Sequence, residues 1–153
     1  NWGKDLELFI LDTRSNRSRN DLPDIPENNK TLLGIQQLRW LEQGLLNSNA
    51  TWKVISTSVP VSIPNCFNRI AGCDNWATDG NSTTTKTFVS EREAFLKFLD
   101  DNNIKNVVFV ATDIHSPAVV NISHDANEDG DNLNLYELVS GPLSAIPLAF
   151  PHV

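Results

Sequence analysis

Asp113 and His115 combine the side-chain types of a metal site. They stand two positions apart and follow the apolar, β-branched run Val107–Val110. In an extended chain, residues i and i+2 point to the same side, and open α/β sheets gather ligands at the carboxyl ends of their strands. A carboxylate with an imidazole suits calcium, manganese, iron or zinc. The pair predicts either part of a metal site or an aspartate that caps a turn beside a locally hydrogen-bonded histidine.

Arg14 belongs to a second candidate group. The stretch Asp5–Asp12 reads as a strand, and Arg14 would point to the same side as Asp12 if the chain remained extended. One interpretation is a structural Asp12–Arg14 pair that holds the long polar loop after it. The other is that Arg14, or Arg17 after it, binds a substrate phosphate through a bidentate contact.

The loop that contains both cysteines offers further candidates. Cys66 and Cys73 have six residues between them, which is not a zinc-binding spacing, so we expect either a local disulfide or two free thiols. Asp74 and Trp76 either line a substrate crevice or are structural. Five N-x-Ser/Thr sequons, which weakly favour a location outside the cytoplasm, begin at Asn16, Asn29, Asn49, Asn81 and Asn121.

An acidic segment later in the chain imitates a calcium loop. Asp125, Asn127, Asp129 and Gly130 have the spacing that opens such a loop. However, Tyr136 occupies the position of the closing acid, and the flanking segments read as strands. The pattern favours a solvated hairpin turn over a weak surface calcium site.

The elements that would position these side chains follow the order β-α-β-α-β-β-β. Strands are predicted over 5–12, 51–60, 107–110, 118–123 and 133–141, and helices over 33–48 and 91–102. This order predicts an α/β fold with a mixed sheet. The strand at 107–110 should be central, because an all-apolar run needs cover on both faces.

The helices carry two local signals. The apolar stripe expected on the first helix consists of Ile35, Leu38, Leu41, Leu45 and Leu46. Ser90 and Glu93 have capping-box spacing and should open the second helix. Trp40 and Trp52 belong to the helix and strand patterns, and both are predicted to lie in the core.

Composition narrows the range of functions. The chain has 153 residues, enough for one domain with a sizeable core, and a formal charge of −7, which argues against binding the phosphate backbone of DNA or RNA. No apolar run approaches the roughly 20 residues of a membrane span. The chain contains no methionine and ends on an apolar stretch. We therefore expect it to be an internal part of a longer protein, of undetermined oligomeric state.

Several blocks together resemble the PhoD-type alkaline phosphatases, a branch of the metallophosphatases. The blocks, in the order of that family's pattern, are FILDTRSNRS (9–18), LGIQQLRWL (33–41), SNATWKVISTSVP (48–60), DNW (74–76), ER (91–92) and NVVFVATDIHS (106–116). The last block corresponds to the family's G-D-V-H motif. Thr112 replaces its glycine, while Asp113 and His115 remain. The resemblance implies that both are metal ligands of a bi- or trinuclear site.

The resemblance also implies a fold and an activity. The fold would be part of a metallophosphatase-type α/β/β/α sandwich with mixed sheets, and the activity hydrolysis of phosphate mono- or diesters outside the cytoplasm: secreted, periplasmic or at the cell surface. The ions would be Ca²⁺ and Fe³⁺, with Zn²⁺ or Mn²⁺ as alternatives. The family's upstream ligand motifs have no counterpart here, so residues 1–153 are expected to be a partial catalytic domain, inactive alone. A non-catalytic calcium-binding module and a decayed phosphatase kept as a scaffold are the alternatives.

Overall fold

The structure is a computed structural model that describes residues 3–66, 72–77 and 85–144. The sequon at Asn81 lies outside these ranges. In the described part of the chain, no helix is long and apolar enough to cross a membrane.

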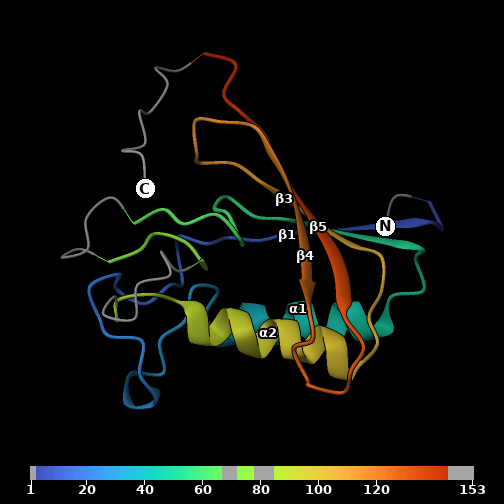
Figure 1. Cartoon of the computed structure of the whole chain (residues 1–153), viewed down its shortest axis with the longest axis horizontal. Coiled ribbons are helices and arrows are strands. Elements are labelled where there is room, and N and C mark those ends of the chain that lie inside the picture. Colours follow the sequence, from blue (N-terminus) through green and yellow to red (C-terminus); the bar gives the residue numbers. More distant parts are fainter. Residues whose placement is uncertain (1–2, 67–71, 78–84, 145–153) are drawn as a thin grey trace.

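One five-stranded mixed sheet organises the molecule (Figure 1). Its strands are β1 (Leu6–Ile10), β2 (Trp52–Ser56), β3 (Val107–Ala111), β4 (Ala118–His124) and β5 (Leu133–Val139). The spatial order is β1-β2-β3-β5-β4. All neighbours are parallel except β4 and β5, which form an antiparallel hairpin. The predicted order of elements and the mixed sheet are confirmed.

Two helices cover one face of this sheet. Figure 1 shows α1 (Ile35–Asn47) and α2 (Val89–Asp101) below the strands, with α2 in front of α1 in this view. A 3-10 turn, η1 (Pro26–Asn28), belongs to the first long loop. The core lies between the sheet and the helices. It consists mainly of leucines and phenylalanines, among them Phe9, Leu41, Leu45, Phe95, Leu99 and Phe109.

The strand β3 is central, as predicted, but only one of its faces is fully covered. Val107, Phe109 and Ala111 are buried, whereas Val108 and Val110 are partly exposed. Val107 and Phe109 belong to the core shared with the helices, whereas Ala111 packs in a small second cluster with Ile114 and Val139. Successive side chains alternate between the two faces of a strand. The described residues form a single sheet, which is one of the two that an α/β/β/α sandwich contains.

Four residues predicted to be buried are exposed instead. Ile35 and Leu46 lie in the first and last turns of α1, so the stripe that contacts the core is shorter than predicted. Trp40 is about half exposed and contacts Phe9 edge-on. Trp52 is exposed because it lies on the face of β2 opposite to the buried Ile55, away from the helices.

The predicted capping box of α2 is wrong. The helix begins at Val89, so Ser90 lies within the first turn and makes no side-chain cap. Asp24, from the first long loop, replaces it: its carboxylate accepts hydrogen bonds from the backbone N–H of Ser90 at 3.0 Å and from the hydroxyl of Thr87 at 2.9 Å. A distant residue therefore satisfies the helix end, which local spacing could not predict.

Candidate functional site at the carboxyl ends of the strands

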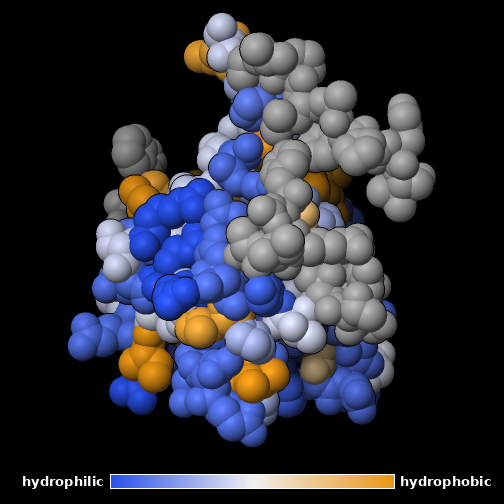
Figure 2. All heavy atoms as spheres, turned by 90° about the vertical axis from the view of Figure 1, so that its left-hand side faces the viewer, coloured by the Kyte–Doolittle hydropathy of each residue, from blue (hydrophilic) through white to orange (hydrophobic). Residues whose placement is uncertain are grey.

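The segments that leave four of the strands emerge from the same edge of the sheet. Backbone hydrogen bonds continue the parallel ladder beyond the strands: Leu11 N–H to Ser56 O, Thr57 N–H to Val110 O and Ser140 N–H to Ala111 O, each 2.9 Å. Figure 2 looks toward this edge and shows hydrophilic residues gathered there. The edge is the position at which open α/β sheets bind ligands.

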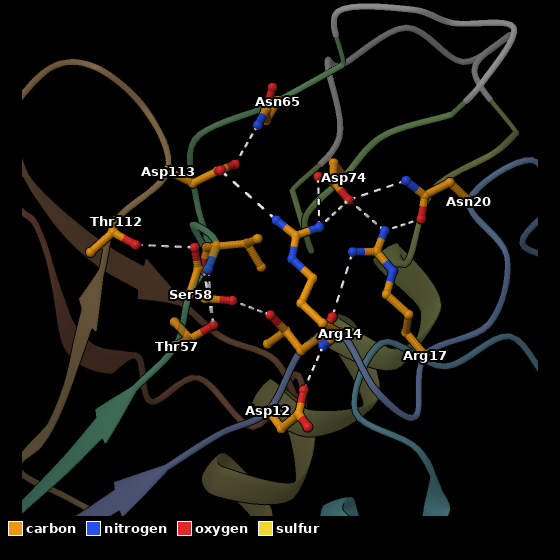
Figure 3. Close-up of polar contacts among 12 residues, drawn as sticks. Asp12, Arg14, Arg17, Asn20, Thr57, Ser58, Asn65, Asp74, Thr112 and Asp113 are labelled. Carbon is orange, nitrogen blue, oxygen red and sulfur yellow. Dashed lines mark hydrogen bonds and ion pairs between the residues drawn. The ribbon is translucent and has the colours of Figure 1, made fainter. Parts of the chain in front are cut away.

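Hydroxyl groups link the ends of the first three strands. The Thr13 hydroxyl forms a hydrogen bond with the Ser58 hydroxyl, and the Thr112 hydroxyl donates to the Ser58 carbonyl at 3.2 Å. These contacts join the segments after β1, β2 and β3 (Figure 3). Thr112, which replaces the family's glycine, thus has a structural partner here.

Arg14 lies between two carboxylates. Its Nη1 donates to Oδ1 and Oδ2 of Asp74 at 2.9 and 2.8 Å, and its Nη2 is 3.9 Å from Oδ1 of Asp113. About half of the Arg14 side chain is exposed. Figure 3 shows the guanidinium reaching between the two acids. Arg14 is therefore both anchored and accessible to a ligand.

Arg17 reinforces the same carboxylate from a more buried position. Its Nη2 is 2.5 Å from Oδ1 of Asp74, and only 10% of its side chain is exposed. It also donates to the side-chain oxygen of Asn20, whose amide in turn donates to Asp74 at 3.1 Å. The guanidinium of Arg17 lies over the ring of Phe88, 5.3 Å from its centroid. These contacts immobilise Arg17, which in turn helps to hold Asp74 in position.

The contacts between Asp74 and its neighbours shift the pKa values of both Asp74 and Arg14. Burial acts to raise the pKa of the Asp74 carboxyl, but hydrogen bonds from Arg14 and Asn20 and the positive charges of Arg17 and Arg14 outweigh it, so the pKa lies below its ordinary value. The hydrogen bond to Asp74 raises the pKa of Arg14. Both groups are thus held ionised.

Asp113 has an unusual backbone conformation and a side-chain partner from a distant loop. Its φ is +78°, in the left-handed region that non-glycine residues rarely adopt, although aspartate tolerates it better than most. Its Oδ2 accepts a hydrogen bond from Nδ2 of Asn65 at 2.6 Å. The chain after β3 turns instead of extending, so the alternation argument for Asp113 and His115 does not hold.

Asp113 and His115 nevertheless line the same shallow pocket. Its volume is about 310 Å³, and the segment after β5 also lines it through Ser140, Gly141 and Pro142. A carboxylate and an imidazole are suitable metal ligands, but two ligands are too few to complete a metal site. No group of three or more metal-binding side chains occurs within the described ranges.

Asp12 does not form the predicted side-chain pair with Arg14. Its Oδ1 accepts the backbone N–H groups of Arg14 and Ser15 at 2.8 and 2.9 Å, which closes a tight turn directly after β1. Hydrogen bonds from Ser15 and Arg14 lower the pKa of the Asp12 carboxyl. The side chain of Gln37 in α1 holds the backbone of Asp12 through two further hydrogen bonds. Asp12 therefore shapes the loop that presents Arg14.

The cysteine loop contributes both a site residue and a core residue. A disulfide joins Cys66 and Cys73, which confirms one of the two alternatives. Asp74 belongs to the polar cluster that it forms with Arg14, Arg17 and Asp113. Trp76 is buried, and its indole N–H donates to the carboxylate of Glu91 at 3.0 Å, so its role is structural.

The acidic segment after β4 forms a hydrogen-bonded hairpin turn. Asp125 accepts backbone N–H groups from Asp129 and Gly130 at 3.1 and 2.9 Å, and Asp129 accepts that of Asp131 at 2.9 Å. Asp100 of α2 anchors the turn from outside by accepting two more backbone N–H groups. These contacts are typical of a structural turn.

Two residues of the cluster carry no sequence signal. Asn20 and Asn65 are single asparagines in polar loops, and neither has a motif or a periodic position. Their partners are Asp74 and Asp113, which are 54 and 48 residues away. Only the fold reveals such contacts, although the position of Asn65 beside Cys66 is a weak hint.

The fold and the cluster define an α/β protein with a polar, arginine-containing site at the carboxyl edge of a mixed sheet. The family model described as PhoD-like phosphatase matches residues 1–150. The chain belongs to the PhoD-like phosphatase family, which confirms the resemblance seen in its motifs.

Two comparisons agree with this assignment. Alkaline phosphatase D of Bacillus subtilis (strain 168) is 27% identical over 155 aligned residues, which cover 94% of this chain and 25% of that protein. A solved structure described as "Structure of PhoD" superposes with a TM-score of 0.70 at 25% identity, covering 92% of this chain and 27% of that one. The chain therefore spans about a quarter of the length of these relatives.

Proposed function

We propose that the whole protein is a metal-dependent phosphoester hydrolase. The observation that supports this most is the convergence of Arg14, Asp113 and His115 at the carboxyl edge of the sheet in a member of the PhoD-like phosphatase family. An anchored guanidinium with exposed N–H groups suits a phosphate oxygen. The substrates would be phosphate monoesters or diesters.

Asp113 and His115 would supply part of a metal shell. Their oxygen and nitrogen donors suit Ca²⁺ together with Fe³⁺, or Zn²⁺ or Mn²⁺. Two donors do not complete such a shell, and the remaining ligands would come from parts of the protein outside the described residues. When bound, the ions would supply Lewis-acid activation of the phosphoryl group and of water. By this proposal residues 1–153 alone are inactive.

The protein side chains around this site would bind and orient the ester. Arg14, fixed by Asp74, would bind a phosphoryl oxygen with the outward-facing part of its guanidinium. Asn65 would hold the orientation of the Asp113 carboxylate through its hydrogen bond to Oδ2. Arg17 would keep Asp74 ionised and in place, and so would act only through Arg14.

A location outside the cytoplasm belongs to the same proposal. The Cys66–Cys73 disulfide supports it, because disulfides persist in oxidising compartments and are rare in the cytosol. The protein would be secreted, periplasmic or attached to the cell surface.

Metal removal and restoration test the activity. The whole protein is incubated with a chelator, dialysed, and assayed on p-nitrophenyl phosphate and on bis-p-nitrophenyl phosphate after addition of single metals and of calcium with iron. We expect loss of hydrolysis on chelation and recovery with at least one metal combination. Undiminished hydrolysis by the chelated, metal-free protein would contradict metal dependence, and absence of hydrolysis under every condition would favour the scaffold alternative.

A further inference from the structure

The disulfide stands between two residues that contact the candidate site. Asn65 directly precedes Cys66 and donates to Asp113 at 2.6 Å. Asp74 directly follows Cys73 and accepts both short hydrogen bonds of Arg14. The residues at the two ends of the disulfide-closed loop therefore both contact the candidate site, Asn65 through Asp113 and Asp74 through Arg14, Arg17 and Asn20.

Two hydrogen bonds hold the arms of this loop together beside the disulfide. The backbone N–H of Asp74 donates to the carbonyl of Asn65 at 3.0 Å. The side chain of Asn75 donates to the carbonyl of Ile63 at 2.5 Å. The arms are thus paired over a short stretch only, and the disulfide is the one covalent link in the described part of the loop.

We propose that the Cys66–Cys73 disulfide is a positioning element that keeps Asp74 and Asn65 in reach of Arg14 and Asp113. The idea rests on the proposed function only for the identity of the ligand. When the disulfide is intact, Asp74 holds the guanidinium of Arg14 from one side while the other side faces Asp113. Without the covalent link, hydrogen bonds at a partly exposed surface must oppose the conformational entropy of the loop.

Reduction of the Cys66–Cys73 disulfide removes the covalent link between the two arms of the loop. Dithiothreitol transfers two electrons and two protons to the disulfide: the bond between the two sulfur atoms breaks, Cys66 and Cys73 become thiols, and dithiothreitol becomes its cyclic disulfide. The two arms then separate more readily. Arg14 loses the partner that immobilises it, and its guanidinium becomes more reactive and less well oriented.

The reactivity of Arg14 measures this effect without any assumption about the ligand. Phenylglyoxal modifies accessible guanidinium groups, and mass spectrometry of peptides gives a separate rate for each arginine. The exposed Arg39 of α1 is an internal reference. In the whole protein, the double variant Cys66→Ser/Cys73→Ser should modify Arg14 about tenfold faster than the wild type, the factor for loss of one charge-assisted hydrogen bond. The Asp74→Asn variant should show a similar increase.

A second variant separates positioning from general stability. Ile122→Ala removes buried side-chain atoms in β4 and should lower the melting temperature without changing the reactivity of Arg14. If the double cysteine variant fails to fold, the wild type treated with dithiothreitol under native conditions replaces it, with circular dichroism as the check of folding. An Arg14 rate equal to that of the oxidised wild type in the reduced or cysteine-free protein would overturn the proposal.

Addition of inorganic phosphate makes the two proposals distinguishable. Protection of Arg14 by phosphate supports its role in binding the substrate, and the disulfide effect is measured in the absence of phosphate. If the disulfide changes the Arg14 rate but phosphate does not protect, the positioning role stands and the phosphate-binding role of Arg14 fails. If Arg14 is modified at the same rate with and without the disulfide, and phosphate protects it equally well in both forms, the positioning role of the disulfide fails.

Discussion

Two groups of acidic residues lie at opposite ends of the sheet, and their carboxylates have different kinds of hydrogen-bond partners. At the carboxyl edge, Asp74 and Asp113 are bound by side chains that are 60 and 48 residues away, Arg14 and Asn65. In the hairpin turn, the carboxylate of Asp125 accepts backbone N–H groups only four and five residues away. The contacts at the carboxyl edge therefore require the tertiary fold, whereas those of the hairpin turn form between residues close together in the chain.

The difference in partners decides which cluster is suited to a ligand. In the turn, the carboxylates of Asp125 and Asp129 accept backbone N–H groups, and Asp129 also accepts the side-chain amide of Asn127; no cation faces either carboxylate among the described contacts. At the carboxyl edge, positive and negative side chains face each other with half of Arg14 exposed. The proposed phosphate ester needs cationic donors, and of the two described clusters the one at the carboxyl edge has them. The acidic segment that most resembles a calcium loop in sequence is thus the less promising site.

The strongest test of this comparison removes the metal-binding side chains. In the whole protein, Asp113→Asn and His115→Ala should each lower phosphatase turnover by orders of magnitude, because each removes a proposed ligand. Asparagine tolerates the left-handed conformation at position 113, so the backbone should remain intact. Steady-state kinetics on p-nitrophenyl phosphate provide the measurement.

The matched control for that test lies in the hairpin turn. Asp129→Ala also removes one carboxylate near a strand end, and turnover and calcium binding should both remain at the wild-type level. Near-normal turnover in either site variant, or loss of calcium binding in Asp129→Ala, would reverse the roles of the two clusters.

A second prediction concerns the shape of the guanidinium. Arg14→Lys keeps the charge but removes the planar group that contacts both oxygens of Asp74. We expect KM to rise about tenfold, as for loss of a charge-assisted hydrogen bond, with a smaller change in kcat. Arg19→Lys is the control, because Arg19 is exposed and its ion-pair partner among the described residues is the nearby Asp21. An equal KM in the two variants would exclude Arg14 from substrate binding.

A third prediction uses pH. The pKa of Asp74 is lowered in the folded protein, so its ionised form contributes stability above its ordinary pKa of 3.8, and this contribution is lost as the pH falls through the lower folded value. Asp74→Asn should therefore lower the free energy of unfolding by about 1 kcal/mol at neutral pH. The difference from the wild type should shrink below about pH 4.

Denaturant unfolding at neutral and acidic pH measures this difference. The comparison variant is Asp129→Asn in the hairpin turn, where the described partners of the carboxylate are the backbone N–H of Asp131 and the side-chain amide of Asn127, and neither is an arginine. A wild-type advantage over Asp74→Asn that persists unchanged at the lowest pH would show that the ion pairs with Arg14 and Arg17 are not its source.

The smallest expected effect belongs to the hairpin turn itself. Asp125→Ala removes the acceptor of two backbone N–H groups at an exposed site, where water replaces it, so stability should fall by only about 0.5–1 kcal/mol. Turnover should be unchanged. Thermal unfolding together with the phosphatase assay checks both statements, and a large drop in turnover would mean that the turn communicates with the site.

Local patterns in the sequence determined much of the fold. Strand and helix periodicity predicted every element of the sheet and both helices, because these patterns reflect the alternation and the 3.6-residue repeat of the backbone. The order of the motifs also identified the family, and the position of Asp113 and His115 after a central strand predicted the edge at which they lie. The predictions of elements and of the site edge depend on residues close together in the chain, whereas the family resemblance depends on the order of short blocks between residues 9 and 116.

The tertiary structure alone decided the partners. It paired Arg14 with Asp74 instead of Asp12, gave the cap of α2 to Asp24, and turned Trp52 away from the helices. These outcomes depend on which loops meet at one edge of the sheet and which face the helices cover. Side-chain contacts between residues 48 to 66 positions apart leave no periodic trace in the sequence, because nothing in the local backbone requires them.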